Sequence, residues 1–82
     1  LVPIMATLID QDGEREVAAK TLQVGDRVRV LAGATLPADG VIVAGEASLN
    51  EAMLTGEQLP LFKQRGDLVY AGTINTDAPL QI

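Results

Sequence analysis

Short apolar runs alternate with turn residues along the whole chain, in the pattern of a domain built from short strands. Eight glycines and four prolines are spread through the length and divide it into short segments. Residues 27–30 alternate arginine with valine, as in a strand with one buried face. No segment spaces its apolar residues at i, i+3, i+4 and i+7 over several turns. The pattern therefore predicts an all-β domain.

The boundaries of the predicted strands follow from the turn residues between them. Residues 4–9 and 14–18 form a predicted hairpin around a turn at 10–13. Residues 41–43 are a continuous apolar run, which indicates a strand buried on both faces. Residues 59–62 are expected at a sheet edge, because a proline cannot donate to a central ladder. The other candidate strand segments are residues 27–30, 48–54 with a bulge, 68–70, 73–75 and 80–82. Not every candidate segment is expected to form a strand, and we expect about seven or eight short strands in all. A helical turn or bend is expected at 18–22 and a loop at 32–39.

The composition excludes several classes of function. The chain has no Cys and no His, which excludes disulfides, cysteine nucleophiles, histidine-dependent triads and most transition-metal sites. A net charge of −5 and an aromatic content of 2% argue against nucleic-acid binding. No apolar run approaches the length of a membrane span, and the first residues do not resemble a signal peptide.

The length of 82 residues fits a single small domain over residues 1–82. With one Phe, one Tyr and no Trp, its core is expected to consist of many small aliphatic side chains. The chain begins with a leucine in place of a starting methionine, which we interpret as the mark of a fragment from a longer protein.

Three local motifs are better explained as ordinary surface structure. Residues 10–13 resemble part of a Ca²⁺ loop, but the glycine comes too early and Thr21 stands where a bidentate glutamate is needed. We interpret them as a hairpin turn. Residues 65–67 spell an adhesion tripeptide, which we also interpret as a turn. Lys20 and Lys63 lack the tight hairpin tip of a biotinyl or lipoyl carrier, so both are interpreted as solvated charges.

The pattern Gly-Asp-x-Val occurs twice, at residues 25–28 and 66–69, each time before a predicted strand. A glycine followed by an aspartate is common in turns. Two copies do not establish a repeat architecture, so we predict two similar turns.

Residues 54–57 carry the remaining candidate for chemistry. Thr55, Gly56 and Glu57 combine a hydroxyl, a hinge-like glycine and a carboxylate at the tip of a predicted loop. A carboxylate in such a place is able to orient or deprotonate a water molecule. A tripeptide of this kind also arises by chance as an exposed turn, and without its surroundings the turn is the better explanation.

With its surroundings, this loop resembles the actuator domain of P-type ATPases, the ion pumps that pass through an aspartyl phosphate. The resemblance runs from residue 22 to residue 75, roughly two-thirds of the chain. Its motifs stand in the family's order and spacing and are highly specific in combination. They are VGDRV at residues 24–28, LPADG at 36–40, EAMLTGEQLP at 51–60, Lys63, GD at 66–67 and AGTIN at 71–75.

The chain departs from the family pattern at a few positions. Leu49, Asn50 and Ala52 stand where the family usually has Val, Asp and Ser, and Leu61 replaces a Val after the proline. Residues 78–79 read Ala-Pro where a Gly is common. None of these changes touches the TGE tripeptide at residues 55–57.

The resemblance implies both a fold and a mechanism. The fold is a small, distorted jelly-roll or barrel-like β unit, the β-core of the actuator. Glu57 is expected to position a water molecule and take its proton, so that the water hydrolyses an aspartyl phosphate in another domain. Gly56 is expected to let the backbone approach the phosphate, and Thr55 to brace the loop. Rotation of the domain would then couple hydrolysis to ion transport.

The resemblance also implies partners and a location. Those partners are the phosphorylation and nucleotide-binding domains of the same parent chain and the linkers to its transmembrane helices, with no nucleic acid. ATP and Mg²⁺ would be bound by other domains, and no cofactor or metal is expected in this fragment. The fragment is expected to be a monomer, inactive by itself, from the cytoplasmic part of an integral membrane protein.

Within the superfamily, the motifs MLTGE and AGTIN resemble the heavy-metal branch and favour copper, with zinc or cadmium next. The ion, the direction of transport and the oligomeric state do not follow from this sequence. The alternative is a stand-alone acidic β-domain that binds a protein partner.

Overall fold

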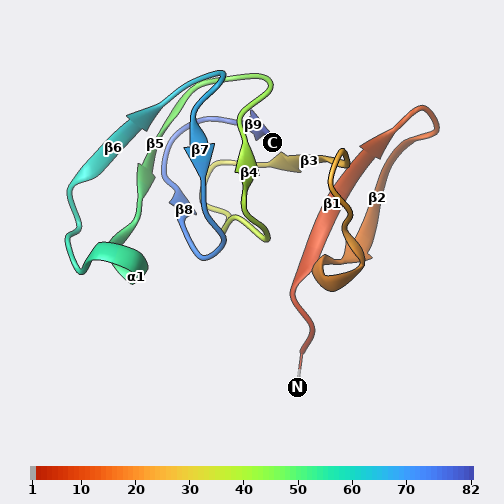
Figure 1. Ribbon diagram of the computed structural model, residues 1–82, viewed down its shortest axis with the longest axis horizontal. Helices are drawn as coiled ribbons and strands as arrows, with labels where there is room; N and C mark the ends of the chain where they lie inside the picture. The colour runs from red at the N-terminus through yellow and green to blue at the C-terminus, as the bar shows by residue number, and fades with distance from the viewer. Residues whose placement is uncertain (1) are drawn as a thin grey trace.

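The computed structural model describes residues 2–82 and consists almost entirely of short antiparallel strands (Figure 1). The predicted all-β class is confirmed. The described residues form nine strands and two single helical turns, in the order β1 (Met5–Asp10), β2 (Gly13–Ala18), η1 (Ala19–Thr21), β3 (Arg27–Val30), β4 (Gly40–Val41), β5 (Ala47–Asn50), α1 (Ala52–Thr55), β6 (Pro60–Lys63), β7 (Leu68–Val69), β8 (Ile74–Asn75) and β9 (Leu80–Gln81).

The strands pair into three small sheets. A four-stranded sheet has the order β2-β1-β3-β9, a three-stranded sheet the order β6-β5-β8, and β4 pairs with β7 alone. Figure 1 shows the β1–β2 hairpin at one side of the molecule, β5, β6 and α1 at the other, and β4 and β7 between them. As predicted, β6 with its proline lies at a sheet edge.

The core is built of small aliphatic side chains from all three sheets, as the composition indicates. Leu49 and Val30 are among the most deeply buried. Phe62 and Tyr70, the two aromatic residues, are exposed by 60% and 38%. The buried apolar set is Ala6, Val28, Val30, Leu36, Ile42, Ala47, Leu49, Val69, Leu80 and Ile82.

A buried asparagine joins the sheets through the core. Asn75 is fully buried, and its Nδ2 donates to the carbonyl oxygens of Val30 at 3.2 Å and Ala78 at 2.6 Å. Buried polar groups of this kind stabilise a fold only when they are hydrogen-bonded. Asn75 thereby links β8 to the end of β3.

The interpretation of residues 41–43 as a strand buried on both faces is wrong. Only Ile42 is buried, whereas Val41 and Val43 are 41% and 39% exposed. Successive side chains of an extended segment point to opposite faces, and the described chain covers only the Ile42 face. Regular pairing is limited to Gly40–Val41 in β4.

The prediction of one bulged strand over residues 48–54 is also wrong beyond residue 50. β5 ends at Asn50, and the single helical turn α1 follows. The side-chain oxygen of Asn50 accepts a hydrogen bond from the Ala52 amide at 2.9 Å, which turns the chain out of the strand. This asparagine, followed by the four good helix formers Glu51 to Leu54, is the sequence signal for the helical turn.

The two Gly-Asp segments are both turns, and they have the same hydrogen bonds. In each, the aspartate amide donates to the carbonyl of a glutamine three residues earlier at 2.9 Å. In each, the aspartate carboxylate accepts a hydrogen bond from the backbone amide of that glutamine at 2.8 Å. The glycines Gly25 and Gly66 have φ values of 98° and 94°. The hairpin turn at residues 10–13 also forms, with Asp12 N donating to Asp10 Oδ1 at 2.8 Å.

Candidate functional site

The TGE tripeptide lies where α1 ends and the chain turns back toward β6. Thr55 is the last residue of α1, and Gly56 follows in a left-handed conformation with φ 77° and ψ −4°. The Gly56 amide donates to the Ala52 carbonyl at 2.8 Å, which closes the helical turn. The tripeptide is therefore at the end of a hydrogen-bonded turn and projects from the body of the molecule (Figure 1).

The hydroxyl of Thr55 hydrogen-bonds on both sides of the turn. Its Oγ1 donates to the carbonyl of Glu51 at 3.4 Å and accepts a hydrogen bond from the amide of Glu57 at 3.2 Å. The Thr55 amide also donates to the Glu51 carbonyl, at 3.1 Å. Thr55 thus connects the start of α1 to the backbone of Glu57.

Gly56 is required by the backbone conformation. Its positive φ is disfavoured for residues with a Cβ. A Cβ at this position would have no described atom within 4 Å, so crowding within the chain is not the reason for the glycine. The open space beside Gly56 leaves its backbone accessible from outside the domain.

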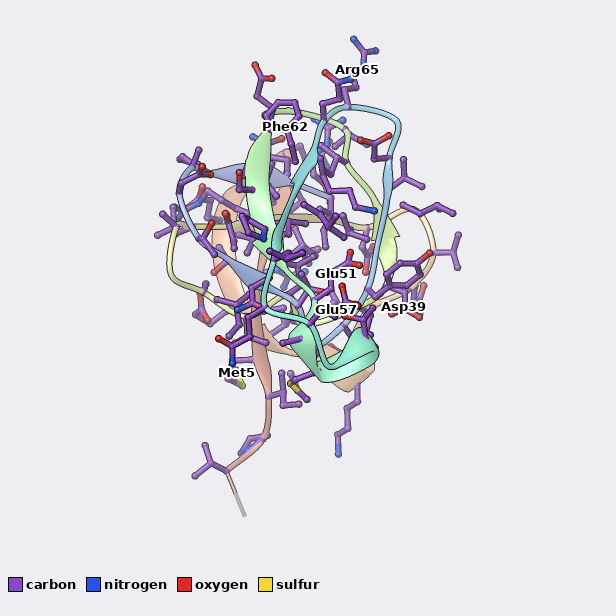
Figure 2. The ribbon with its side chains drawn as sticks, turned by 90° about the vertical axis from the view of Figure 1, so that its left-hand side faces the viewer. Met5, Asp39, Glu51, Glu57, Phe62 and Arg65 are labelled. Carbon is purple, nitrogen blue, oxygen red and sulfur yellow. The ribbon has the colours of Figure 1, made fainter. Side chains whose placement is uncertain are left out.

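The side chain of Glu57 is exposed, and its carboxylate has no ion pair among the residues that the structure describes. Figure 2 shows Glu57 beside α1, far from Arg65 at the opposite end of β6. Its backbone is held by Thr55, while its carboxylate is free to meet a group outside the domain. A general base needs this combination of a fixed backbone and an accessible oxygen.

Two other motifs of the sequence meet beneath α1. The carboxylate of Asp39, in the PADG loop, accepts a hydrogen bond from the amide of Ala71 at 2.8 Å. The next residue, Gly72, donates to the Leu36 carbonyl at 3.0 Å. A Cβ on Gly72 would lie 3.6 Å from the sulfur of Met53, so Met53 of α1 rests on this turn. The PADG loop therefore holds the AGTIN turn, and Met53 of α1, whose side chain is 78% exposed, lies beside this turn.

The interpretation of Lys63 as a solvated charge is wrong. Its side chain is only 21% exposed, and its Nζ lies 3.7 Å from Oε2 of Glu51, whose side chain is 9% exposed. The same Nζ donates to the carbonyl of Leu68 at 3.1 Å. Neither Glu51 nor Asp39 was selected as a site residue from the sequence, although both belong to the motifs that define the resemblance.

A groove of about 510 Å³ opens on a different part of the surface. Its walls include Leu22, Val24, Val41 and Tyr70, and no residue of the TGE tripeptide lines it. The exposed carboxylate of Glu57 therefore lies outside this groove.

The described residues offer neither a metal site nor a membrane span. No group of three or more Asp or Glu side chains in residues 2–82 is arranged to hold a metal ion. Within the same residues, no helix is long and apolar enough to cross a membrane.

The comparison with protein families decides the identity of the chain. The model of the P-type ATPase actuator domain, of the E1-E2 ATPase family, matches residues 1–82. The chain belongs to this family. The resemblance given by the motifs is thereby confirmed, and the match favours an actuator domain over a stand-alone protein-binding module.

Named relatives of this actuator domain are pumps for several heavy metals. It is 45% identical over 83 residues to a probable cobalt/nickel-exporting P-type ATPase of Mycobacterium tuberculosis, covering 100% of this chain and 13% of the relative. It is 42% identical over 82 residues to a copper-exporting P-type ATPase of Vibrio cholerae, covering 100% of this chain and 9% of the relative. The expected similarity to the heavy-metal branch is thereby confirmed.

A solved structure supports the fold at high similarity. A zinc-transporting PIB-type ATPase in the E2.Pi state matches with a TM-score of 0.90 and 39% sequence identity, over 96% of this chain and 13% of that one. The predicted β fold of the actuator domain is thus confirmed. The domain spans only about one-eighth of the length of such pumps.

Proposed function

We propose that residues 1–82 form the β-core of the actuator in a longer heavy-metal pump, where Glu57 promotes hydrolysis of an aspartyl phosphate. The phosphorylated aspartate would lie in another domain of the same protein. The observation that carries this proposal is the exposed Glu57 carboxylate on a hydrogen-bonded backbone, within a chain that belongs to the actuator family.

The proposed step is the attack of water on phosphorus, in line with the departing aspartate carboxylate. The water oxygen bonds to phosphorus as the bond from phosphorus to the aspartate oxygen breaks. Glu57 accepts the proton that the water loses. The products are inorganic phosphate and the free aspartate. A well-placed general base contributes about 10²–10⁴-fold to such a rate.

Thr55 and Gly56 would act by placing this carboxylate. Thr55 fixes the amide of Glu57 relative to α1. Gly56 supplies the left-handed turn that directs residue 57 away from the domain. The uncrowded space beside Gly56 would admit the phosphorylated partner.

The second proposed role is mechanical. In the parent pump, the actuator would move as a rigid body and pull on linkers to the transmembrane helices, which couples hydrolysis to ion movement. The antiparallel sheets and their shared core suit a rigid lever. In such a pump the domain would lie on the cytoplasmic side, beside the phosphorylation and nucleotide-binding domains. ATP and Mg²⁺ would be bound by those domains.

The proposed cargo is a heavy-metal cation, with copper favoured by the MLTGE and AGTIN motifs. The relatives are named for cobalt and nickel, copper, and silver, and a solved neighbour for zinc. With no Cys and no His, this domain would not compete for the ion.

The test is Glu57→Gln in the full-length pump that contains this chain. We expect the phosphoenzyme to form at the normal rate and to decay at least about 100-fold more slowly, because the base is lost and the side-chain shape is kept. Decay of the ³²P-labelled phosphoenzyme after a chase with unlabelled ATP measures this rate. Glu46→Gln is the matched control, because Glu46 is also exposed and lies outside the loop. Normal decay in Glu57→Gln would contradict the proposal.

A further inference from the structure

A buried carboxylate lies immediately before α1. Glu51 is only 7% exposed, and its Oε2 has no hydrogen-bond partner among the described residues. The one cation near this oxygen in the described chain is the ammonium of Lys63, at 3.7 Å. A buried carboxylate is costly without an opposite charge, so Glu51 depends on Lys63.

Lys63 contacts three parts of the structure at once. It is the last residue of β6, and its ammonium approaches Glu51, donates to the carbonyl of Leu68 in β7 at 3.1 Å, and lies 6.0 Å from the ring centroid of Tyr70. Lys63 pairs with Ala47, which is buried on the inner face of β5. Its stem therefore lies along that face, toward the end of β5 where Glu51 follows.

The backbone of Glu51 is the anchor of the turn that carries the TGE tripeptide. Its carbonyl accepts hydrogen bonds from the amides of Leu54 at 2.8 Å and Thr55 at 3.1 Å, and from the Thr55 hydroxyl at 3.4 Å. Thr55 then holds the amide of Glu57. One residue, Thr55, therefore links the backbone of Glu51 to the amide of Glu57.

The ion pair also closes the TGE loop. The chain leaves Glu51, passes through α1 and the loop, and returns in β6 to Lys63. Glu51 and Lys63 thus lie at the two ends of this segment, and their side chains meet across it. Figure 2 labels both Glu51 and Glu57 near α1; Glu51 is buried, whereas Glu57 is exposed.

We propose that Glu51 and Lys63 are positioning residues for Glu57, and that their ion pair sets the direction in which α1 presents the TGE tripeptide. This inference rests on the proposed function of Glu57. Neither residue touches the reacting atoms; both act through Thr55 and the loop backbone. An error of about 1 Å in the placement of a catalytic group costs up to 10²-fold in rate, so a defect in the pair is expected to affect dephosphorylation.

The first test is Lys63→Met in the full-length pump, which keeps the length of the stem and removes the charge. We expect phosphoenzyme formation to stay within about 2-fold of normal and its decay to slow by about 10-fold or more. Lys63→Arg retains the charge and should restore most of the decay rate. Arg65→Met is the matched control, because Arg65 is exposed and lies at the far end of β6 (Figure 2). Normal decay in Lys63→Met would overturn the inference.

Loss of one charge leaves the other buried, so Lys63→Met alone risks a folding defect. The double variant Glu51→Gln with Lys63→Met removes both charges and avoids that risk. If the pair orients Glu57, the double variant still decays slowly while it forms the phosphoenzyme normally. If the phosphoenzyme of the double variant decayed at the normal rate, the two charges would only neutralise each other in the buried site. The inference that they orient Glu57 would then be wrong.

The second test places Lys63→Met in the Glu57→Gln background. If Lys63 acts only through the Glu57 carboxylate, its removal causes little further slowing once that carboxylate is gone. If the slowing caused by Lys63→Met is as large in the Glu57→Gln background as in the unmodified pump, Lys63 acts on the domain in general and the inference is wrong. Glu57→Gln by itself tests the proposed function. The proposed function of Glu57 and the positioning role of Lys63 are therefore tested by different variants and can fail independently.

Discussion

At the scale of single residues, the sequence identifies the TGE residues of the loop, but it does not identify the ion pair of Glu51 and Lys63 behind them. Thr55, Gly56 and Glu57 are recognisable because a specific set of motifs surrounds them. Glu51 and Lys63 look like ordinary charged residues in the same sequence. Their burial depends on β5 and β6 pairing and on Leu68 lying close to Lys63, which are contacts between separate elements. Local patterns carry no information about such contacts.

A substitution at Gly56 is predicted to affect both the stability of the domain and the decay of the phosphoenzyme, and a control glycine separates the two effects. Gly56→Ala forces a Cβ into a left-handed conformation, which costs about 1–2 kcal/mol in the free energy of unfolding. Gly66→Ala is a matched control, because its φ is 94° and a Cβ there also meets no described atom within 4 Å. Urea unfolding of the chain should give similar losses for both variants. In the pump, only Gly56→Ala should slow decay of the phosphoenzyme; equal slowing by both would trace the defect to stability alone.

At the scale of elements, turn residues predicted most boundaries, and errors arose where packing or a side-chain cap decided. The β1–β2 hairpin, β3 and the edge strand β6 lie within one or two residues of their predicted positions. The prediction for residues 41–43 is wrong because a run of three apolar residues does not reveal which faces are covered. The predicted strand over 48–54 is too long because the side chain of Asn50 starts a helical turn.

Asn50 therefore offers a prediction about α1. Asn50→Ala removes the acceptor for the Ala52 amide and should lower the free energy of unfolding by about 1 kcal/mol. Asn50→Asp keeps an oxygen in the same place and should cost much less. It also restores the residue usual in the family at this position. Thermal unfolding of the three forms provides the measurement, and equal losses for Ala and Asp would contradict a capping role.

At the scale of the whole molecule, three motifs that are far apart in sequence lie next to one another. The PADG loop, the AGTIN turn and α1 come from three parts of the chain, and Asp39, Gly72 and Met53 connect them. The sequence predicts that these motifs belong together, since their combination identifies the family. The sequence does not reveal the contacts among Asp39, Gly72 and Met53, because these contacts form only when the sheets assemble.

This arrangement leads to a prediction that distinguishes support of the site from support of the fold. Asp39 and Asp77 each accept one hydrogen bond from the amide of a distant residue, Ala71 at 2.8 Å and Ser48 at 3.0 Å. Replacing either aspartate by alanine should cost about 0.5–1.5 kcal/mol, the net contribution of one exposed hydrogen bond. Only Asp39 supports the turn beneath Met53. Asp39→Ala should therefore slow decay of the phosphoenzyme in the pump, whereas Asp77→Ala should lower stability by a similar amount and leave decay near normal. If both variants slowed decay equally, α1 would depend on the rigidity of the whole domain, and the chain of contacts from Asp39 through Met53 would have no special role.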